Sequence, residues 1–267
     1  MVFPADRPLA DVKGDAAVLR YLEKQDFPAE RCVGEVSTHE GQGVLVTAFV
    51  KGTEPAPSTR TQGELGDLVG RLHALKGAPK AARRDAGGLH LFTVDCTIRS
   101  EIDTARACLE AGAFRGTDKA WDALVAKLTS ADDFAALPKA LVHPDPATVN
   151  AITTKAGIVL IDWSGAGFGP RVVGLGLVLS ACVRGKTFDR EAADAAMGSY
   201  RHHVTLDAAE LERLEDAIAH RALIHEAYSW AVGMASQRKP ASNKSWPHNN
   251  DGIAKLAQYV RARWSDR

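Results

Sequence analysis

One stretch of the chain constrains its fold and its chemistry more than any other. It runs from Leu141 to Pro170 and reads LVHPDPATVNAITTKAGIVLIDWSGAGFGP. Within it, two runs rich in β-branched and aliphatic residues, 151–154 and 158–161, are separated by the tripeptide Lys-Ala-Gly. This pattern predicts a strand, a tight turn and a second strand.

Two oxygen-bearing side chains flank this predicted hairpin. Its centre falls near Ala156, six residues from both Asn150 and Asp162, so we expect these two residues to lie opposite each other at its open end. Cβ atoms of opposed residues are roughly 4.5–5.5 Å apart. One carboxamide oxygen and one carboxylate at that spacing suit Mg²⁺, which takes few protein ligands and adds water and phosphate. The hairpin thus predicts a Mg·nucleotide site.

A further acid, Asp145, precedes the hairpin by a few residues. A carboxylate beside a metal-bound triphosphate can hold an attacking hydroxyl and accept its proton. We therefore take Asp145 as the candidate catalytic residue, with Asn150 and Asp162 as the candidate metal ligands.

The motif HxDxxxxN followed by IDW, from His143 to Trp163, resembles the aminoglycoside phosphotransferase family, small-molecule kinases distantly related to protein kinases. The resemblance implies that Asp145 is the catalytic aspartate and that His143 supports its loop. It also implies ATP- or GTP-dependent phosphorylation of a hydroxyl on a small molecule such as an antibiotic, a sugar or an amino alcohol. Mg²⁺ is the implied cofactor.

The same resemblance implies an α+β, protein-kinase-like fold with two lobes. Residues 1–52 would form an abbreviated N-lobe, a helix plus a β-hairpin ending at a hinge, and residues 53–267 a mostly helical C-lobe. Periodicity predicts a helix at 11–23 and strands at 31–37 and 44–50. By resemblance, Asp15 on this helix supports the site, and the backbone of Thr47, Ala48 and Phe49 binds the nucleotide base.

The rest of the chain is expected to be helical around the hairpin. Periodicity predicts helices at 64–76, 100–111, 117–128, 175–183, 190–202, 207–236 and 251–264. The glycines at 165–169 lack a βαβ unit, which favours a loop beside the metal site over a dinucleotide-binding turn.

The acceptor is expected in the cleft between the metal hairpin and the helices after residue 185. Carboxylates and aromatic rings are available there from Glu226, Tyr228, Trp230, Trp246, His248 and Asp251. The chain has 33 basic and 33 acidic residues, which gives no sign of the acidic excess that a polycationic antibiotic calls for. A neutral or weakly charged acceptor is an equally good expectation.

The family's small lobe carries a phosphate-covering loop and a strand lysine, and neither has a counterpart ahead of the first predicted helix. Three explanations stay open: a start at an internal methionine, a short form that completes its sheet as a homodimer through the exposed edge, or a pseudokinase or interaction module without efficient catalysis. Arg7, Lys13 and Arg171 are the candidate replacement cations.

Composition restricts the partners. The formal net charge of zero offers no bulk field for nucleic acid or an anionic membrane. No segment approaches the ~18 apolar residues of a membrane span. The four cysteines lack CxxC spacing, and the first residues are charged where a signal peptide would be apolar. These features predict a cytoplasmic protein.

Overall fold

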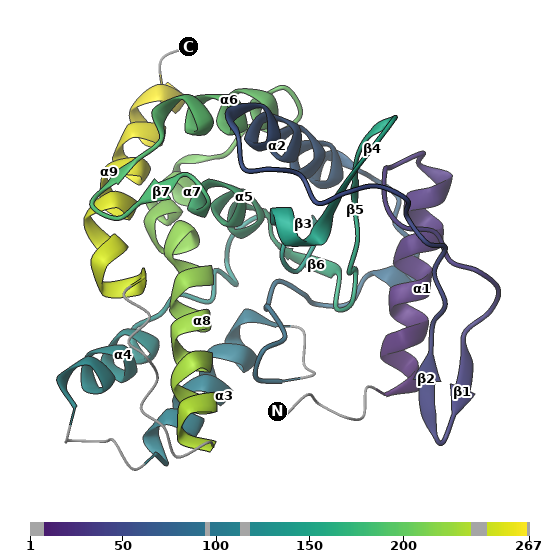
Figure 1. The fold of residues 1–267 in the computed structure, drawn as a ribbon, viewed down its shortest axis with the longest axis horizontal. Coiled ribbons are helices and arrows are strands. Elements are labelled where there is room, and N and C mark those ends of the chain that lie inside the picture. The colour runs from purple at the N-terminus through teal and green to yellow at the C-terminus, as the bar shows by residue number, and fades with distance from the viewer. Residues whose placement is uncertain (1–7, 94–96, 113–117, 236–244, 266–267) are drawn as a thin grey trace.

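The computed structural model describes residues 8–93, 97–112, 118–235 and 245–265. Figure 1 shows a small part that contains α1, β1 and β2 beside a larger, mostly helical part. Among the described residues the strands form four separate two-stranded sheets. The predicted α+β class is therefore correct, with helices dominating.

The small part begins with the predicted helix, α1 (Leu9–Lys24), which buries Leu19 and Leu22 against the rest of the molecule. A hairpin follows, made of β1 (Ser37–His39) and β2 (Gln42–Val44). Both residues of its turn, at 40 and 41, have positive φ (50° and 81°), as a tight two-residue hairpin turn requires.

These strands are shorter than predicted because the ladder is interrupted. Ser37 pairs with Val44, whereas the next pair along is Cys32 with Thr47. Between these two pairs, the first strand segment contains four residues, 33–36, and the second contains only two, 45 and 46. Gly34 sits in the longer side with φ of 75°, a bulge conformation that costs glycine little.

The hairpin that carries the predicted metal ligands exists as β4 (Ala151–Thr154) and β5 (Gly157–Leu160). Its register differs from the prediction by one residue. Thr154 pairs with Gly157, so the turn has two residues and Asn150 lies opposite Ile161, whose N–H donates to the Asn150 carbonyl at 3.0 Å. The predicted direct opposition of Asn150 and Asp162 is wrong.

A second small sheet places the loop that carries Asp145. In it β3 (Lys139–Val142) pairs with β6 (Gly167–Pro170), so the predicted loop at 165–169 is in part a strand. A Cβ at either glycine of β6, at 167 or 169, would lie 2.5 Å from a carbonyl oxygen of residue 84 or 86. Glycine is needed here because another backbone segment lies directly against β6.

The helical part follows the predicted elements with shifted bounds. Its helices are α2 (Thr59–Ala74), α3 (Ile98–Glu110), α4 (Lys119–Thr129), α5 (Arg171–Ser180), α6 (Arg190–Arg201), α7 (Ala208–Glu212), α8 (Leu214–Ala235) and α9 (Ser245–Ser265). The short elements are η1 (Lys80–Ala82), η2 (Thr148–Asn150), β7 (Val183–Arg184) and β8 (Thr187–Phe188).

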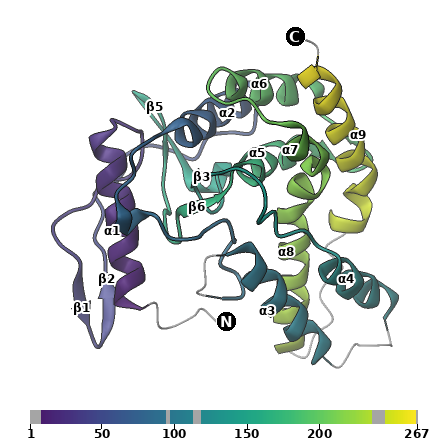
Figure 2. The same ribbon diagram turned by 180° about the vertical axis from the view of Figure 1, so that it is seen from behind.

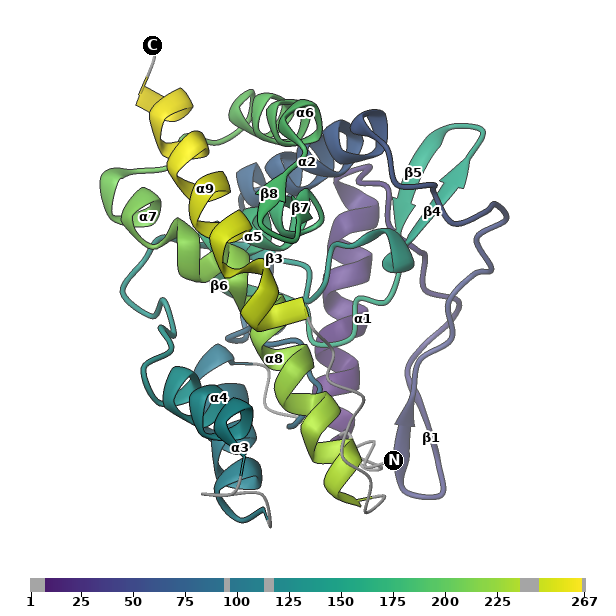
Figure 3. The same cartoon turned by 60° about the vertical axis from the view of Figure 1, so that its left-hand side comes forward.

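Two of these helices show why bounds are hard to predict. Helix α2 begins five residues before the predicted start because the Ser58 hydroxyl accepts the Thr61 N–H at 3.1 Å and caps it. The segment predicted as one helix at 207–236 is divided between α7 and α8. Helix α2 packs on α6 (Figure 2), and α9 crosses α8 (Figure 3).

One apolar core joins the two parts. Leu19 and Phe27 from the small part belong to the same buried cluster as Leu160, Trp163 and the helices beyond. The chain crosses between the parts near residue 53, where Thr53 and Thr153 exchange backbone hydrogen bonds of 3.2 and 2.8 Å. Division at residue 52 stays a prediction. No helix among the described residues is long and apolar enough to cross a membrane.

Candidate active site

His143 joins the two loops that carry the predicted acids. Its side chain is buried, with Nε2 hydrogen-bonded to the Ile161 carbonyl at 2.9 Å and Nδ1 accepting the Asp145 N–H at 3.1 Å. Burial lowers the pKa of His143 to about 4. The ring is therefore neutral at pH 7, with its proton on Nε2. Trp163 packs edge-on against it at 4.6 Å between ring centroids.

Asn150 lies at the end of η2, where the loop that carries Asp145 meets β4. Its Nδ2 donates to the backbone carbonyl of Asp145 at 2.9 Å. Since the two ends of a carboxamide point apart, this bond directs Oδ1 away from the loop. The side chain is thus oriented by the same loop that carries the candidate catalytic acid.

Asp162 follows β5 in a left-handed backbone conformation, with φ of 62°. Its N–H donates to the Glu30 Oε1 at 2.9 Å, and its side chain is exposed. Glu30 is itself fixed, because its N–H donates to the Leu160 carbonyl at 3.1 Å. Non-glycine residues seldom adopt this conformation, so the Glu30 contact helps to hold Asp162 where it is. No pattern in the sequence indicated this contact of Glu30.

A cavity of about 780 Å³ opens beside Asp162. Its walls come from α1, from Glu30, from β2 and the segment after it, from β4, and from residues 161–164 after β5. All three predicted hinge residues line the cavity, as do Asp15 and Asp162. The full set of lining residues is Val12, Asp15, Leu19, Glu30, Gln42, Gly43, Leu45, Thr47, Ala48, Phe49, Val50, Ile152, Ile161, Asp162, Trp163 and Ser164. Its volume suits a nucleotide-sized ligand.

The predicted hinge presents backbone groups to this cavity. The N–H of Ala48 is already used, since it donates to the Arg31 carbonyl at 2.8 Å. Within the part of the chain that the structure describes, neither the Ala48 carbonyl nor the N–H of Val50 has a hydrogen-bond partner. The available acceptor and donor are therefore two residues apart, and the donor lies one residue beyond the predicted segment.

Asp15, on α1, is buried and holds the loop that follows Asp162. Its carboxylate accepts the Gly165 N–H at 2.9 Å and forms an ion pair with Arg84. Arg84 also donates to the carbonyls of Asp11 and Ala166, both at 2.9 Å. This arginine, which the sequence did not single out, ties α1 to the loop at 165–166.

Of the three cations proposed from the sequence, neither Lys13 nor Arg171 lines the cavity. Arg171 donates both Nε and Nη2 to the Glu210 carboxylate at 2.7 Å, and it does not line the cavity. Lys13 is exposed on α1, and Arg7 lies outside the described residues.

The candidate catalytic acid has an arginine partner. Nε and Nη2 of Arg221, on α8, donate to Oδ1 and Oδ2 of Asp145 at 2.9 and 3.0 Å. Hydrogen bonding to Asp145 raises the pKa of Arg221, which stays charged. His225 lies one turn further along α8, and its pKa is lowered, first by burial and then by the charge of Arg221.

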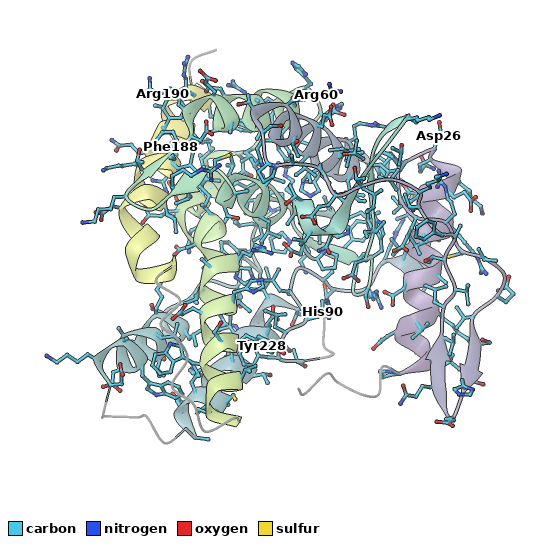
Figure 4. All side chains as sticks on the ribbon, in the orientation of Figure 1. Asp26, Arg60, His90, Phe188, Arg190 and Tyr228 are labelled. Atoms are coloured by element: carbon cyan, nitrogen blue, oxygen red, sulfur yellow. The ribbon has the colours of Figure 1, made fainter. Side chains whose placement is uncertain are left out.

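Two of the six predicted acceptor residues do not form a binding surface. Glu226 and Trp230 are buried, with the indole N–H of Trp230 donating to Oε1 of Glu226 at 3.1 Å, so this part of the prediction is wrong. Both belong to the interior because Trp230 packs against Trp121. Tyr228 is half-buried on the lower part of α8 (Figure 4).

The last predicted acceptor residues come from the start of α9. Asp251 is exposed there. The side chains of Trp246 and His248 lie outside the described residues.

The donor set suits a metal bound together with phosphate. Among the described residues, no cluster of three or more His, Cys, Asp or Glu side chains could hold an ion. The Asp162 carboxylate lines the cavity, whereas Asn150 is not among the lining residues. Both the Asn150 carboxamide oxygen and the Asp162 carboxylate are hard oxygen donors of the kind Mg²⁺ prefers. Two such ligands fit an ion that takes its remaining ligands from water and a nucleotide.

Comparison with known proteins identifies the family. The family model described as "Phosphotransferase enzyme family" matches residues 1–224. No curated protein matches the chain. Among solved structures, amicoumacin kinase hAmiN in complex with AMP-PNP, Ca²⁺ and Ami has a TM-score of 0.62 at 15% identity, over 95% of this chain and 78% of that chain.

Two further solved structures are similar over nearly the whole chain. A choline/ethanolamine kinase family protein from Mesorhizobium loti has a TM-score of 0.60 at 17% identity, covering 95% of this chain and 78% of that chain. An aminoglycoside phosphotransferase from Alicyclobacillus acidocaldarius has the same TM-score and identity, covering 97% and 83%. The predicted kinase-like two-lobe fold is confirmed, and the chain belongs to the phosphotransferase enzyme family.

Proposed function

We propose that this protein transfers the γ-phosphoryl group of ATP or GTP to a hydroxyl of a small molecule. One observation carries the proposal: His143 fixes the loop of Asp145 to the strand end that leads to Asp162, and Asp162 lines a nucleotide-sized cavity. Family membership supports the reaction class.

The nucleotide would occupy the cavity with its base against the hinge. A purine edge presents a hydrogen-bond donor beside an acceptor. The Ala48 carbonyl and the Val50 N–H are complementary to such an edge, and no hydrogen bond among the described residues uses them. The phosphates would then extend toward Asp162 at the other wall.

Asn150 and Asp162 would hold Mg²⁺ through the carboxamide oxygen and the carboxylate. When bound, this ion neutralises charge on the phosphates. The chain's own contribution is orientation: the Asp145 carbonyl fixes Asn150, and the Glu30 carboxylate fixes the backbone of Asp162.

Asp145 would bind the acceptor hydroxyl and take its proton. The hydroxyl oxygen forms a bond to the γ-phosphorus, the bond from that phosphorus to the departing nucleoside diphosphate breaks, and the proton passes to Asp145. Most of the acceleration in such reactions comes from positioning and charge neutralisation.

A catalytically impaired nucleotide- or metabolite-binding protein is the second candidate. The observation in its favour is that Arg221 engages both oxygens of Asp145. Such a protein would bind a nucleotide without turning it over.

The experiment is a thermal-shift series with ATP and with GTP, each with and without Mg²⁺, on the wild type and on Asp162→Ala. Glu110→Ala is the matched control, because Glu110 is an exposed carboxylate at the end of α3. We expect a Mg²⁺-dependent shift in the wild type and control that is lost in Asp162→Ala. Identical curves in all three proteins would exclude the proposal, and nucleotide binding without ADP release would favour the second candidate.

A further inference from the structure

Asp145 lies beside a fixed positive charge. Both of its oxygens accept hydrogen bonds from Arg221 at 2.9 and 3.0 Å, and the two side chains are 17% and 29% exposed. The following inference rests on the proposed function, in which Asp145 receives the acceptor hydroxyl. Any acceptor that reaches Asp145 must therefore also meet Arg221.

Arg221 has binding capacity left over. A guanidinium has five N–H donors in a planar fork. Asp145 accounts for two hydrogen bonds, and within the part of the chain that the structure describes no other group accepts from Arg221. The side chain is partly exposed, so the remaining donors can reach a ligand next to Asp145.

No acidic side chain offsets this charge on the same face of α8. The half-exposed residues that follow Arg221 along α8 are Ala222, His225, Tyr228, Ser229, Ala231 and Met234, none of them acidic. Glu226 points into the core and binds Trp230. At the start of α8, Asp216 is paired with Lys127.

This arrangement separates three classes of acceptor. An ammonium group near Asp145 would face the guanidinium, and like charges at close range are unfavourable. A neutral alcohol would leave the free N–H donors without a partner from the ligand. A carboxylate or phosphate would accept from them in the two-pronged geometry that arginine favours.

We propose that Arg221 determines acceptor specificity by binding an acidic group, so that the substrate is a small hydroxyl compound carrying a carboxylate or a phosphate. The hydroxyl and the acid must be close together in the molecule, because Asp145 and Arg221 are in direct contact. The amino alcohols and aminoglycosides of the neighbouring kinases have the opposite charge.

A matched three-carbon series tests the proposal. The probes are glycerol, 3-aminopropane-1,2-diol, glycerate and glycerol 3-phosphate, which share a diol and differ in charge. Binding is measured by calorimetry with Mg·AMP-PNP present, and transfer from Mg·ATP by phosphorus NMR. We expect glycerate or glycerol 3-phosphate to bind at least about tenfold more tightly than glycerol. The anion that binds more tightly shows whether the acidic group of the substrate is a carboxylate or a phosphate. Preference for the amino diol, or equal binding of all four, would overturn the proposal.

Variants of Arg221 separate recognition from a merely inhibitory contact. In Arg221→Gln we expect the KM of the preferred anion to rise about 10- to 100-fold while the KM of glycerol changes little. Arg221→Lys should recover part of the loss, since it keeps the charge without the fork. Arg213→Gln, which removes another Arg–Asp pair at 2.7 Å, is the control and should leave the preference intact.

Two results would contradict the assignment to Arg221. The first is faster transfer to glycerol and the amino diol in Arg221→Gln with unchanged binding of the anions, because Arg221 would then only restrain Asp145. The second is the same anion preference in both Arg221 variants and the wild type. Because nucleotide binding is measured separately, loss of all Mg²⁺-dependent nucleotide binding in the wild type would refute the proposed function itself, whereas retained binding with a cationic preference refutes this inference alone.

Discussion

Asp15 and Asp145 are both paired with an arginine, yet the two pairs differ in what surrounds them. Arg84 uses Nε, Nη1 and Nη2 on protein acceptors, and its partner Asp15 has a side chain that is only 5% exposed. Arg221 is more exposed and binds Asp145 alone among the described residues. The first pair closes a structural contact, whereas the second leaves donors available beside the proposed catalytic acid. An ion pair therefore indicates a binding function only when its arginine is partly exposed and has N–H donors that no protein group uses.

The largest effect should come from the acid of the second pair. Asp145→Asn keeps the shape of the side chain but cannot take a proton at neutral pH, and we expect kcat to fall about 10²- to 10⁴-fold. ADP release in the presence of acceptor measures this, and circular dichroism checks the fold. A loss of less than about tenfold would show that Asp145 is not the base.

The first pair should matter for stability. Asp15→Ala leaves Arg84 partly buried without its carboxylate, and we expect a loss of about 3 kcal/mol in the free energy of unfolding. Asp85→Ala breaks the more exposed pair with Lys139 and should cost at most about 1 kcal/mol. Urea unfolding of both variants gives the comparison, and equal losses would contradict the distinction between them.

Lowering the pH should affect the two regions differently, because the loop of Asp145 is held by a buried histidine whereas Asp15 is held by an arginine. Burial lowers the pKa of His73 to about 3 and those of His143 and His220 to about 4. In the unfolded chain the pKa of each histidine is near 6.5. As the pH falls below that value, the unfolded chain therefore takes up protons that the folded protein does not. Stability is therefore full above about pH 6.5 and falls as the pH drops toward 4, by at most about 1.4 kcal/mol per pH unit for each histidine.

Urea unfolding between about pH 7.5 and 5 measures this slope. His220→Leu removes one of the three groups, and its Nε2 has no hydrogen-bond partner among the described residues. We expect a shallower slope in this variant. A slope equal to that of the wild type would show that His220 titrates normally.

The smallest effect is expected at Glu30. Glu30→Ala removes the acceptor of the Asp162 N–H and should weaken Mg·ATP binding by a few-fold, about what one hydrogen bond of 0.5–1.5 kcal/mol contributes. Glu30→Gln keeps an acceptor oxygen and should recover most of the affinity. Calorimetry distinguishes the two, and identical losses would assign the effect to the charge of Glu30 instead.

Whether a feature could be predicted from the sequence depends on how far apart along the chain the interacting residues lie. The hairpin at 151–160 and the helix α1 were predictable because their patterns are local. The register error at Asn150 has a local cause too, since the sequence did not distinguish a two-residue from a three-residue turn.

Contacts between distant segments were beyond the sequence. Arg84 is 69 residues from Asp15, and Arg221 is 76 residues from Asp145. Which charges meet depends on how the helices dock, and composition does not determine that. Glu226 and Trp230 were misplaced for the same reason, because nothing in the sequence of α8 showed that they face the core.

In the proposed function, Asn150 and Asp162 hold the metal of a bound nucleotide. Electron paramagnetic resonance of Mn²⁺·ATP measures this directly, because binding to the protein removes the sharp signal of free manganese. We predict one bound Mn²⁺·ATP in the wild type and in Glu110→Ala, and loss of that binding in Asp162→Ala and in Asn150→Ala. Unchanged manganese binding in both of the last two variants would contradict the account.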